Sequence, residues 1–307
     1  MRQPVVGLVG LGTMGLPVAL RLLEAGFEVL GCRRNAVPEE FLAAGGRAGG
    51  DAAQVAREAR VVITLLPTEG SLADVTAGLV SGATAATVVV EMSILPVAAK
   101  ERARDALGAV GAVVLDAPIS GTPAMVSAGR ASIFCSGLPS KSALREGLPV
   151  DGMPLSGVHD VLTAITPSVQ QVGGFGAGTQ VKHVAHLLLA VNHLAAAEAL
   201  SLARRAGLDL GRLLEVLSTS PASSQALLLR GPMMAAERFT PVTGAVGNLT
   251  EGLTQVQRFA AEQGAATPLL NAALEQYRAA AEAGHADEDV SVMVRALGRR
   301  EQAPADR

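Results

Sequence analysis

The 307-residue chain contains no tryptophan, one tyrosine and two cysteines, and only 17% of its residues are charged. So few aromatic side chains disfavour recognition that stacks nucleic-acid bases on aromatic rings. The net charge of −3 argues against nucleic acid or an anionic membrane as the main partner. The isolated Cys32 and Cys135 are typical of a reducing compartment and do not form a disulfide framework.

Long apolar runs are also missing. No stretch approaches 18 uninterrupted apolar residues, and the N-terminal residues lack the basic region, apolar core and cleavage site of a signal peptide. We therefore expect a cytoplasmic protein without a membrane span. In contrast, 49% of the residues are hydrophobic and 34 are glycine. The length and this composition predict a folded protein with two domains.

Short β-branched runs alternate with helix-like segments in the first half of the chain. The predicted strands cover residues 4–9, 28–32, 61–66, 87–92, 113–116, 131–136 and 168–172, and the helix-like segments include residues 15–25, 52–59 and 97–110. Nearly continuous apolar strands alternating with helices are typical of a parallel sheet covered on both faces. The pattern predicts an α/β fold with a Rossmann-type, doubly wound, mostly parallel sheet.

Strand signals stop after residue 178, and an all-helical domain is predicted to follow. The expected helices cover residues 181–206, 210–218, 224–234, 250–263, 268–283 and 288–297, with Gly or Pro at the breaks. We place the domain boundary in GGFGAG, giving a Rossmann domain over 1–175 and a helical domain over 176–300 that starts with a long interdomain helix. Residues 138–160 are rich in Pro and Gly, which predicts a surface insertion with at most a short helix.

A GxGxxG motif lies where the first strand meets the first helix, the context in which it binds a dinucleotide. Its first glycine allows a tight turn, the second lets the backbone approach a pyrophosphate, and the third lets the helix lie close to the strand. The free N–H groups of the helix then face the phosphates. The predicted cofactor-binding residues here are Gly10, Leu11, Gly12, Thr13, Met14 and Gly15.

The second strand is followed by Arg33 and Arg34, where an NAD-binding protein usually carries an acidic residue for the ribose hydroxyl. Guanidinium groups pair instead with a 2′-phosphate, so we expect NADP rather than NAD. A solvated loop charge is the alternative for either arginine.

Five segments in order, GLVGLGTMG, LLP, EMS, DAPISGTP and GAGTQVKHVAH, resemble the β-hydroxyacid dehydrogenase family. This family includes 3-hydroxyisobutyrate dehydrogenase and the glyoxylate/succinic semialdehyde reductases. The resemblance covers residues 4–297, and it implies a C-terminal domain like that of 6-phosphogluconate dehydrogenase. It also implies an NADP-dependent oxidoreductase that moves hydride between NADPH and a small carbonyl or 3-hydroxy acid.

The resemblance further implies roles for particular residues. Lys182 matches the family's catalytic lysine, which donates a proton to the carbonyl oxygen or takes it from the alcohol. The alternative is a lysine that reaches from the start of the helix to solvent. The residues implied to bind the substrate are Ser120, Gly121 and Thr122. Thr122 replaces a family glycine, and it either tightens the pocket or offers another hydroxyl. Cofactor contacts fall to Leu65, Leu66, Pro67 and, near the nicotinamide, Ser93.

Two positions depart from the family pattern. His186 stands where the family has Asn, one helical turn after the lysine, and we assign it to the catalytic site, with a packed interface histidine as the alternative. Gly247-Asn248-Leu249 replaces the family's Lys-Asp-Leu, so Asn248 is a predicted substrate contact and one positive charge is lost unless Arg258 compensates. An imine reductase and a non-catalytic NADP-binding protein therefore remain alternatives.

The histidines of the long helix do not predict a metal site. His186 and His193 would lie about 10 Å apart along the helix, and no cysteine or carboxylate cluster accompanies them. The family resemblance implies a homodimer or higher homo-oligomer through the helical domain. The apolar face of residues 184–199 fits this expectation, because one small domain would not cover it.

Overall fold

The computed structural model describes residues 5–138, 149–150, 153–155 and 157–299. The chain divides into two compact units, Met1–Lys182 and His183–Arg307. This division falls within the long helix α9 (Ala177–Arg205). The predicted domain boundary, after residue 175, lies just before the start of that helix. It stays a prediction.

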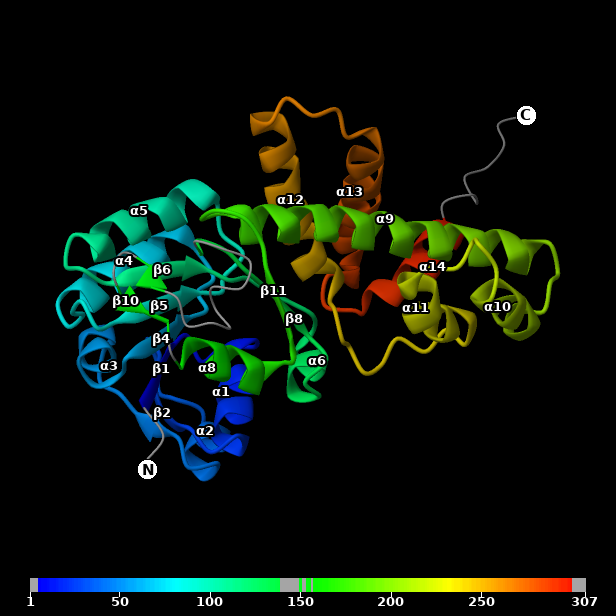
Figure 1. Cartoon of the computed structure of the whole chain (residues 1–307). Helices are drawn as coiled ribbons and strands as arrows, with labels where there is room; N and C mark the ends of the chain where they lie inside the picture. The colour runs from blue at the N-terminus through cyan, green and yellow to red at the C-terminus, as the bar shows by residue number, and fades with distance from the viewer. Residues whose placement is uncertain (1–4, 139–148, 151–152, 156, 300–307) are drawn as a thin grey trace. The chain divides into compact units, whose positions relative to one another are not determined.

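The first unit is built on a six-stranded parallel sheet (Figure 1). The strand order is β3 (Arg47–Ala48), β2 (Glu28–Cys32), β1 (Val5–Val9), β4 (Val61–Thr64), β5 (Val88–Glu91) and β6 (Val113–Asp116). Strand order reverses between β1 and β4, the switch point at which doubly wound sheets bind their ligands. The predicted fold class, a Rossmann-type sheet followed by helices, is confirmed.

Helices cover both faces of this sheet, so successive residues of one strand enter different cores. Val6 and Leu8 of β1 pack with α1 (Gly15–Glu24), whereas Val9 packs with α3 (Ala52–Glu58) and α4 (Glu69–Val80). This arrangement explains why the strands are apolar without a polar-apolar alternation. The remaining helices of the sheet are α2 (Glu39–Ala43) and α5 (Val97–Gly108).

The later strands form a separate three-stranded sheet. Its order is β11 (Ser168–Gln171), β8 (Ser132–Cys135) and β7 (Ile119–Ser120), with β7 antiparallel to β8. Helix α6 (Pro123–Ser127) lies between β7 and β8 in the chain, and α8 (Val158–Ile165) precedes β11. The runs predicted at 131–136 and 168–172 are therefore strands, but they do not extend the main sheet.

Part of the predicted insertion at 138–160 lies outside the described residues. Its described part contains a short antiparallel pair, β9 (Pro149–Val150) with β10 (Met153–Pro154), and the start of α8. The short helix expected there continues to Ile165, beyond the predicted end of the insertion.

The second unit is helical, as predicted. After α9 come α10 (Leu210–Ser218), α11 (Gln225–Ala235), α12 (Val246–Glu262), α13 (Pro268–Ala280), a π-helical turn (Ala281–His285), a 3₁₀ turn (Val290–Val292) and α14 (Met293–Arg299). The core of this unit gathers around Tyr277, whose hydroxyl donates to the carbonyl oxygen of Ala190 at 3.2 Å. Helix α12 begins four residues earlier than expected, so Gly247 and Asn248 belong to its first turn.

By length and composition alone, α9 could cross a membrane. It contains an 18-residue window with a mean hydropathy of 1.3, of which 28% is buried. Core helices of folded domains have the same composition, and Ala190, Ala197 and Leu200 of α9 are fully buried in the second unit. The expected absence of a membrane span stays a prediction.

Candidate active site

The glycine loop between β1 and α1 combines two crowded positions with an open one. Gly10 has a φ of 108°, and a Cβ there would overlap the carbonyl oxygen of Leu65. A Cβ at Gly15 would overlap the carbonyl oxygen of Gly10, whereas a Cβ at Gly12 would meet no atom within 4 Å. The first and third glycines are thus required by the fold. Gly12 instead leaves space beside the backbone, which fits the approach of a pyrophosphate.

The other residues of this loop have different surroundings. Leu11 is buried, and its side chain packs over Gly31 of β2. Thr13 is exposed, and Met14 begins α1 without a side-chain cap, so the first N–H groups of this helix are available to an anion. The structure therefore places Leu11 in the core, where its backbone alone can face a cofactor.

Arg33 and Arg34 directly follow β2, and both are exposed. The neighbouring Cys32 accepts a hydrogen bond through its carbonyl oxygen from Gly10 N at 3.0 Å, which joins the end of β2 to the glycine loop. An Arg34 Nη2 atom lies 4.0 Å from Asp74 Oδ2, and both side chains of this pair are about four-fifths exposed. An exposed pair of this kind stabilises the fold little and leaves the guanidinium free to bind a ligand.

The LLP and EMS segments meet at the ends of β4 and β5. Leu65 N donates to the carbonyl oxygen of Val9 at 3.0 Å, and Leu66 N donates to Ser93 Oγ at 2.8 Å. Ser93 is buried, whereas Pro67 is exposed. The structure thus brings together three of the segments that the sequence assigned to the cofactor: the glycine loop, LLP and EMS.

The DAPISGTP segment turns from β7 into α6. Gly121 has a φ of 155°, and a Cβ there would lie 3.1 Å from Ala131 Cβ. The Thr122 side chain caps α6 by accepting a hydrogen bond from Met125 N at 3.3 Å. Its hydroxyl oxygen therefore has a structural partner that the sequence did not indicate. Ser120, the last residue of β7, is half-buried.

Lys182 Nζ donates a hydrogen bond to Ser120 Oγ at 3.1 Å, so the structure joins the predicted catalytic lysine to the predicted substrate-binding serine. The lysine side chain is 4% exposed, and burial lowers its pKa from 10.5 to about 8. At neutral pH the group is mostly protonated, and about half of it is deprotonated near pH 8. This pKa suits a group that both donates and accepts protons.

A second buried lysine, Lys100, has the opposite environment. Its ammonium group contacts two carboxylates, those of Glu91 and Asp116. Burial by itself lowers the pKa of Lys100, but these two charges and their hydrogen bonds raise it above its ordinary value. Among the described ion pairs, Lys182 has no carboxylate partner, and its pKa therefore falls. Lys100 was not singled out from the sequence, although a lysine in the helix between two strands that each end in an acidic residue was a usable signal.

His186 and Asn248 lie in the second unit, on α9 and α12. A Cβ at Gly252 would lie 3.0 Å from His186 Nδ1, so the ring packs against the backbone of α12. Asn248 is exposed and stands one helical turn before Gly252. Arg258, which we considered as a replacement for the lost charge, follows Asn248 by ten residues, about 15 Å along the helix.

The other histidines of α9 are packed side chains. His193 is buried, and burial with the charge of Arg230 lowers its pKa to about 4. The buried His183 ring lies 5.1 Å from the Phe259 ring, centroid to centroid. Within the described ranges, no three His, Cys, Asp or Glu residues form a group that could hold a metal ion.

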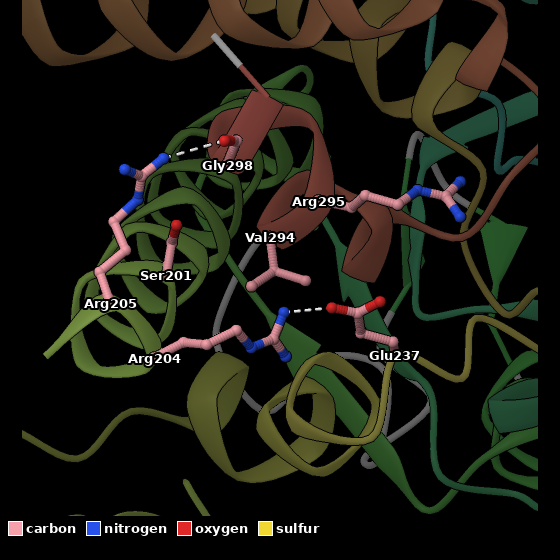
Figure 2. Close-up of a pocket in the computed structure, with 7 residues that line it drawn as sticks. All are labelled: Ser201, Arg204, Arg205, Glu237, Val294, Arg295 and Gly298. Carbon is pink, nitrogen blue, oxygen red and sulfur yellow. Dashed lines mark hydrogen bonds and ion pairs between the residues drawn. The ribbon is translucent and has the colours of Figure 1, made fainter. Parts of the chain in front are cut away.

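A cavity of about 380 Å³ in the second unit contains none of the predicted site residues (Figure 2). It is lined by Ser201, Arg204, Arg205, Glu237, Val294, Arg295 and Gly298. Figure 2 shows Arg204 pointing to Glu237 and Arg205 to Gly298, whose carbonyl oxygen accepts a hydrogen bond at 3.0 Å. These arginines hold α9 to neighbouring segments of the unit.

Two family models match the chain. Residues 5–149 match the NAD binding domain of 6-phosphogluconate dehydrogenase, and residues 176–297 match the NAD-binding domain of NADP-dependent 3-hydroxyisobutyrate dehydrogenase. L-threonate dehydrogenase from Cupriavidus necator is 33% identical over 296 residues, covering 94% of this chain and 95% of the relative. The chain belongs to the β-hydroxyacid dehydrogenase family. It is a nicotinamide-dependent oxidoreductase that acts on CH–OH groups.

Other β-hydroxyacid dehydrogenases are similar over nearly the whole chain. The NAD-dependent L-serine dehydrogenase of Pseudomonas aeruginosa is 29% identical, covering 94% of this chain and 96% of the relative. The solved 3-hydroxyisobutyrate dehydrogenase of Mycobacterium tuberculosis with L-serine has a TM-score of 0.84 at 26% identity, covering 96% of this chain and 99% of that one. An imine reductase from Pseudomonas sp., at 20% identity and a TM-score of 0.58, shares the fold.

Proposed function

We propose that this β-hydroxyacid dehydrogenase moves hydride between NADPH and a small carbonyl or 3-hydroxy acid, with Lys182 as the proton donor and acceptor. The observation that carries the proposal is the contact between Lys182 Nζ and Ser120 Oγ. It joins a buried ammonium group of lowered pKa to a hydroxyl in the segment that the family uses for the substrate.

NADP is the proposed coenzyme, and the residues of the first unit fit it. The open space at Gly12 and the uncapped start of α1 suit a pyrophosphate, and the exposed Arg33 and Arg34 suit a 2′-phosphate. Leu65, Leu66, Pro67 and Ser93 are proposed to line the nicotinamide side. When bound, the coenzyme supplies or accepts the hydride. Arg33 and Arg34 favour reduction as the physiological direction, because NADPH normally serves as a reductant in cells.

Lys182 supplies the proton that balances the hydride. In reduction, the ammonium group of Lys182 donates a proton to the carbonyl oxygen of the substrate. The product is the alcohol, and Lys182 becomes a neutral amine. In oxidation, the neutral amine takes the proton of the alcohol. The Ser120 hydroxyl orients Nζ before the substrate arrives, and we propose that His186 of α9 supports the same proton transfer.

The substrate is proposed to carry a carboxylate held by Ser120, Gly121 and Thr122, with Asn248 as a further contact. The names of three relatives contain threonate, L-serine and 3-hydroxyisobutyrate, and all three compounds are 3-hydroxy acids. Gly247 stands where the family pattern has a lysine, which removes one positive charge. We therefore expect weaker carboxylate binding than in relatives that retain that lysine.

A homodimer through α9 is proposed as the working assembly. Val184 and Leu188 of this helix are more than half exposed, and Leu202 is 69% exposed. With the exposed Ala195 and Ala199, they follow one another at intervals of 4, 7, 4 and 3 residues, which forms one apolar stripe. Monomeric proteins seldom leave such a stripe in water. We further propose a cytoplasmic location.

The test is NADPH oxidation by the purified protein against a panel of small semialdehydes, 2-oxo acids and cyclic imines. We expect turnover of an aldehyde that carries a carboxylate. Lys182→Ala should abolish that turnover and leave NADPH binding nearly unchanged. Equal turnover in this variant would refute the role of the lysine.

An imine reductase is the second candidate. The missing lysine of the Lys-Asp-Leu motif, at Gly247, and the presence of His186 count for this function, and Lys182 counts against it. Turnover of cyclic imines alone would favour this function. NADPH binding without turnover of any compound in the panel would favour a non-catalytic NADP-binding protein.

A further inference from the structure

Lys100 of α5 is completely buried, and three oxygen atoms lie close to its ammonium group. Nζ lies 2.6 Å from Glu91 Oε2 and 2.8 Å from Asp116 Oδ1, and it donates to the carbonyl oxygen of Ser93 at 2.6 Å. A lysine with no exposed surface requires such compensation to keep its charge. The cluster is therefore an integral part of the first unit and not a surface ion pair.

The two carboxylates occupy paired positions at the ends of neighbouring strands. Glu91 ends β5, Asp116 ends β6, and the two residues are partners in the parallel register. Glu91 Oε1 also accepts a hydrogen bond from Ser93 N at 3.0 Å. The backbone of Ser93 is thus held on both sides, by Glu91 at its N–H and by Lys100 at its carbonyl. Ser93 Oγ remains directed to Leu66 N, in the proposed cofactor segment.

Asp116 continues the network into the first turn of α9. Its Oδ1 accepts a hydrogen bond from Thr179 Oγ1 at 2.7 Å, and its Oδ2 accepts one from Thr179 N at 2.9 Å. Ser136 Oγ donates to Asp116 Oδ2 at 3.1 Å and accepts from Gly178 N at 3.0 Å. Asp116 and Ser136 therefore cap α9 from outside the helix, and the carboxylate charge is favourable at this end of the helix dipole.

Thr179 precedes Lys182 by three residues, so both lie on one turn of the same helix. We propose that Lys100 is a positioning residue for the reaction, and that it acts through Asp116 and Thr179 to fix the turn of α9 that presents Lys182 to Ser120. This inference rests on the proposed role of Lys182. It adds that the same ammonium group also holds Ser93, so that the cofactor segment and the proton donor share one buried support.

The network explains how Lys182 can stay buried with only a hydroxyl as its described partner. If the first turn of α9 loosens, Lys182 Nζ moves away from Ser120 Oγ and becomes hydrated. Its pKa then rises from about 8 toward the ordinary 10.5. A displacement of about 1 Å in a reacting group lowers turnover by roughly 100-fold. Loss of the network should therefore change both the pKa of Lys182 and kcat.

Thr179→Val tests the link with little change in volume, because it removes one hydroxyl and keeps the backbone hydrogen bond to Asp116. We expect kcat to fall at least about tenfold, by misplacement of the lysine, with the Kd for NADPH unchanged within about twofold. Thr179→Ser, which keeps the hydroxyl, should restore most of kcat. The matched control is Thr76→Val in α4, a buried threonine whose hydroxyl has no hydrogen-bond partner among the described residues, and its kinetics should match the wild type.

Lys100→Met tests the origin of the network. We expect the same loss of kcat together with weaker NADPH binding, because Ser93 is released as well. If this variant does not fold, Thr179→Val decides alone. Wild-type kcat in both folded variants would overturn the inference.

The pKa of Lys182 gives a readout that needs no substrate. Acetylation of Lys182 by acetic anhydride, followed against pH by mass spectrometry, should show a midpoint near 8 in the wild type and in Thr76→Val. In Thr179→Val, the midpoint should move upward. An unchanged midpoint would overturn the positioning role even if the enzyme assay found no substrate. Turnover in Lys182→Ala would instead contradict the proposed function and leave the shift in midpoint as an independent result.

Discussion

The same substitution at two buried lysines should change the stability of the fold in opposite directions. Lys182 has a hydroxyl partner and a pKa lowered from 10.5 to about 8, whereas Lys100 lies between two carboxylates. Methionine has nearly the same shape as lysine and no charge. Lys182→Met should therefore raise the free energy of unfolding at pH 7, and Lys100→Met should lower it.

The magnitude for Lys182 follows from proton linkage. The difference between 10.5 and about 8, at about 1.4 kcal/mol for each tenfold change in proton affinity, corresponds to about 3 kcal/mol. Loss of the hydrogen bond to Ser120 offsets about 1 kcal/mol. We therefore expect Lys182→Met to be more stable than the wild type by about 2 kcal/mol at pH 7.

The sign of the pH dependence is fixed by the direction of the pKa change. Between pH 8 and 10.5 the unfolded chain binds a proton at Lys182 that the folded chain has lost, so wild-type stability rises with pH in this window. Below pH 8 the folded protein carries the full cost of the buried charge. The advantage of Lys182→Met should therefore be largest below pH 8 and disappear toward pH 10.5.

The assay is urea unfolding followed by circular dichroism at pH 7 and at pH 9.5, with Lys100→Met as the matched control. Breaking a buried ion pair on one side costs about 3–5 kcal/mol, because the carboxylates of Glu91 and Asp116 lose the cation between them. A Lys182→Met protein that is clearly less stable than the wild type at pH 7 would refute the reasoning. So would a difference that does not change with pH.

Four further predictions follow from the contacts described above. Gly12→Ala should leave the melting temperature within about 2 °C of the wild type and weaken NADPH binding. Gly10→Ala should instead destabilise the fold, because the added Cβ would overlap backbone atoms. Thermal melts and coenzyme titration distinguish the two effects. Replacing both Arg33 and Arg34 by Ala should raise the Kd for NADPH at least about tenfold and leave that for NADH nearly unchanged, as fluorescence titration would show; an equal loss for both coenzymes would refute the choice of NADP. Leu188→Glu should convert a dimer to a monomer in sedimentation experiments, since it places a charge in the apolar stripe of α9; an unchanged assembly would exclude that face. Asp289→Ala should cost about 3–5 kcal/mol in urea unfolding, because it leaves Arg230 buried without its ion-pair partner.

The sequence was sufficient for those parts of the fold that depend on local pattern. The strands of the main sheet are buried on both faces, so their apolar runs stand out, and the glycine spacing of residues 10–15 fixes the first turn. Helix α4 was missed because its sequence includes Gly70, Thr76 and Gly78, which weaken a helical signal. A capping box formed by Thr68 and Ser71 stabilises the N-terminus of this helix, and the composition alone does not reveal it.

Contacts between distant segments lay beyond the sequence pattern. Asp116 and Thr179 are 63 residues apart, and only the folded sheet brings the end of β6 to the start of α9. The sequence left open whether Thr122 tightens the substrate pocket or offers a hydroxyl there, and it did not indicate that the Thr122 oxygen caps α6. Gly247 and Asn248 have low helix propensity, yet α12 begins before them, because Gly247 N donates to the carbonyl oxygen of Ala286 at 2.8 Å.

The resemblance supplied the role of Lys182, which helix position alone would not have given. The structure adds its environment: the Lys182 ammonium group is buried, donates a hydrogen bond to Ser120 Oγ and has a pKa of about 8. The same chain contains Lys100, equally buried and oppositely shifted, because of its two carboxylates. Burial alone therefore does not mark a proton donor, and the charges around the group decide.

The most direct test of the central claim is the pH dependence of kcat in both directions, measured with one substrate pair. Lys182 should make reduction fall as the pH rises through about 8, because the proton donor is lost, and oxidation rise through the same pH, because the base is formed. Opposite slopes with a shared midpoint would support Lys182 as the proton donor and acceptor. Rates without a break between pH 7 and 9 in either direction would contradict it.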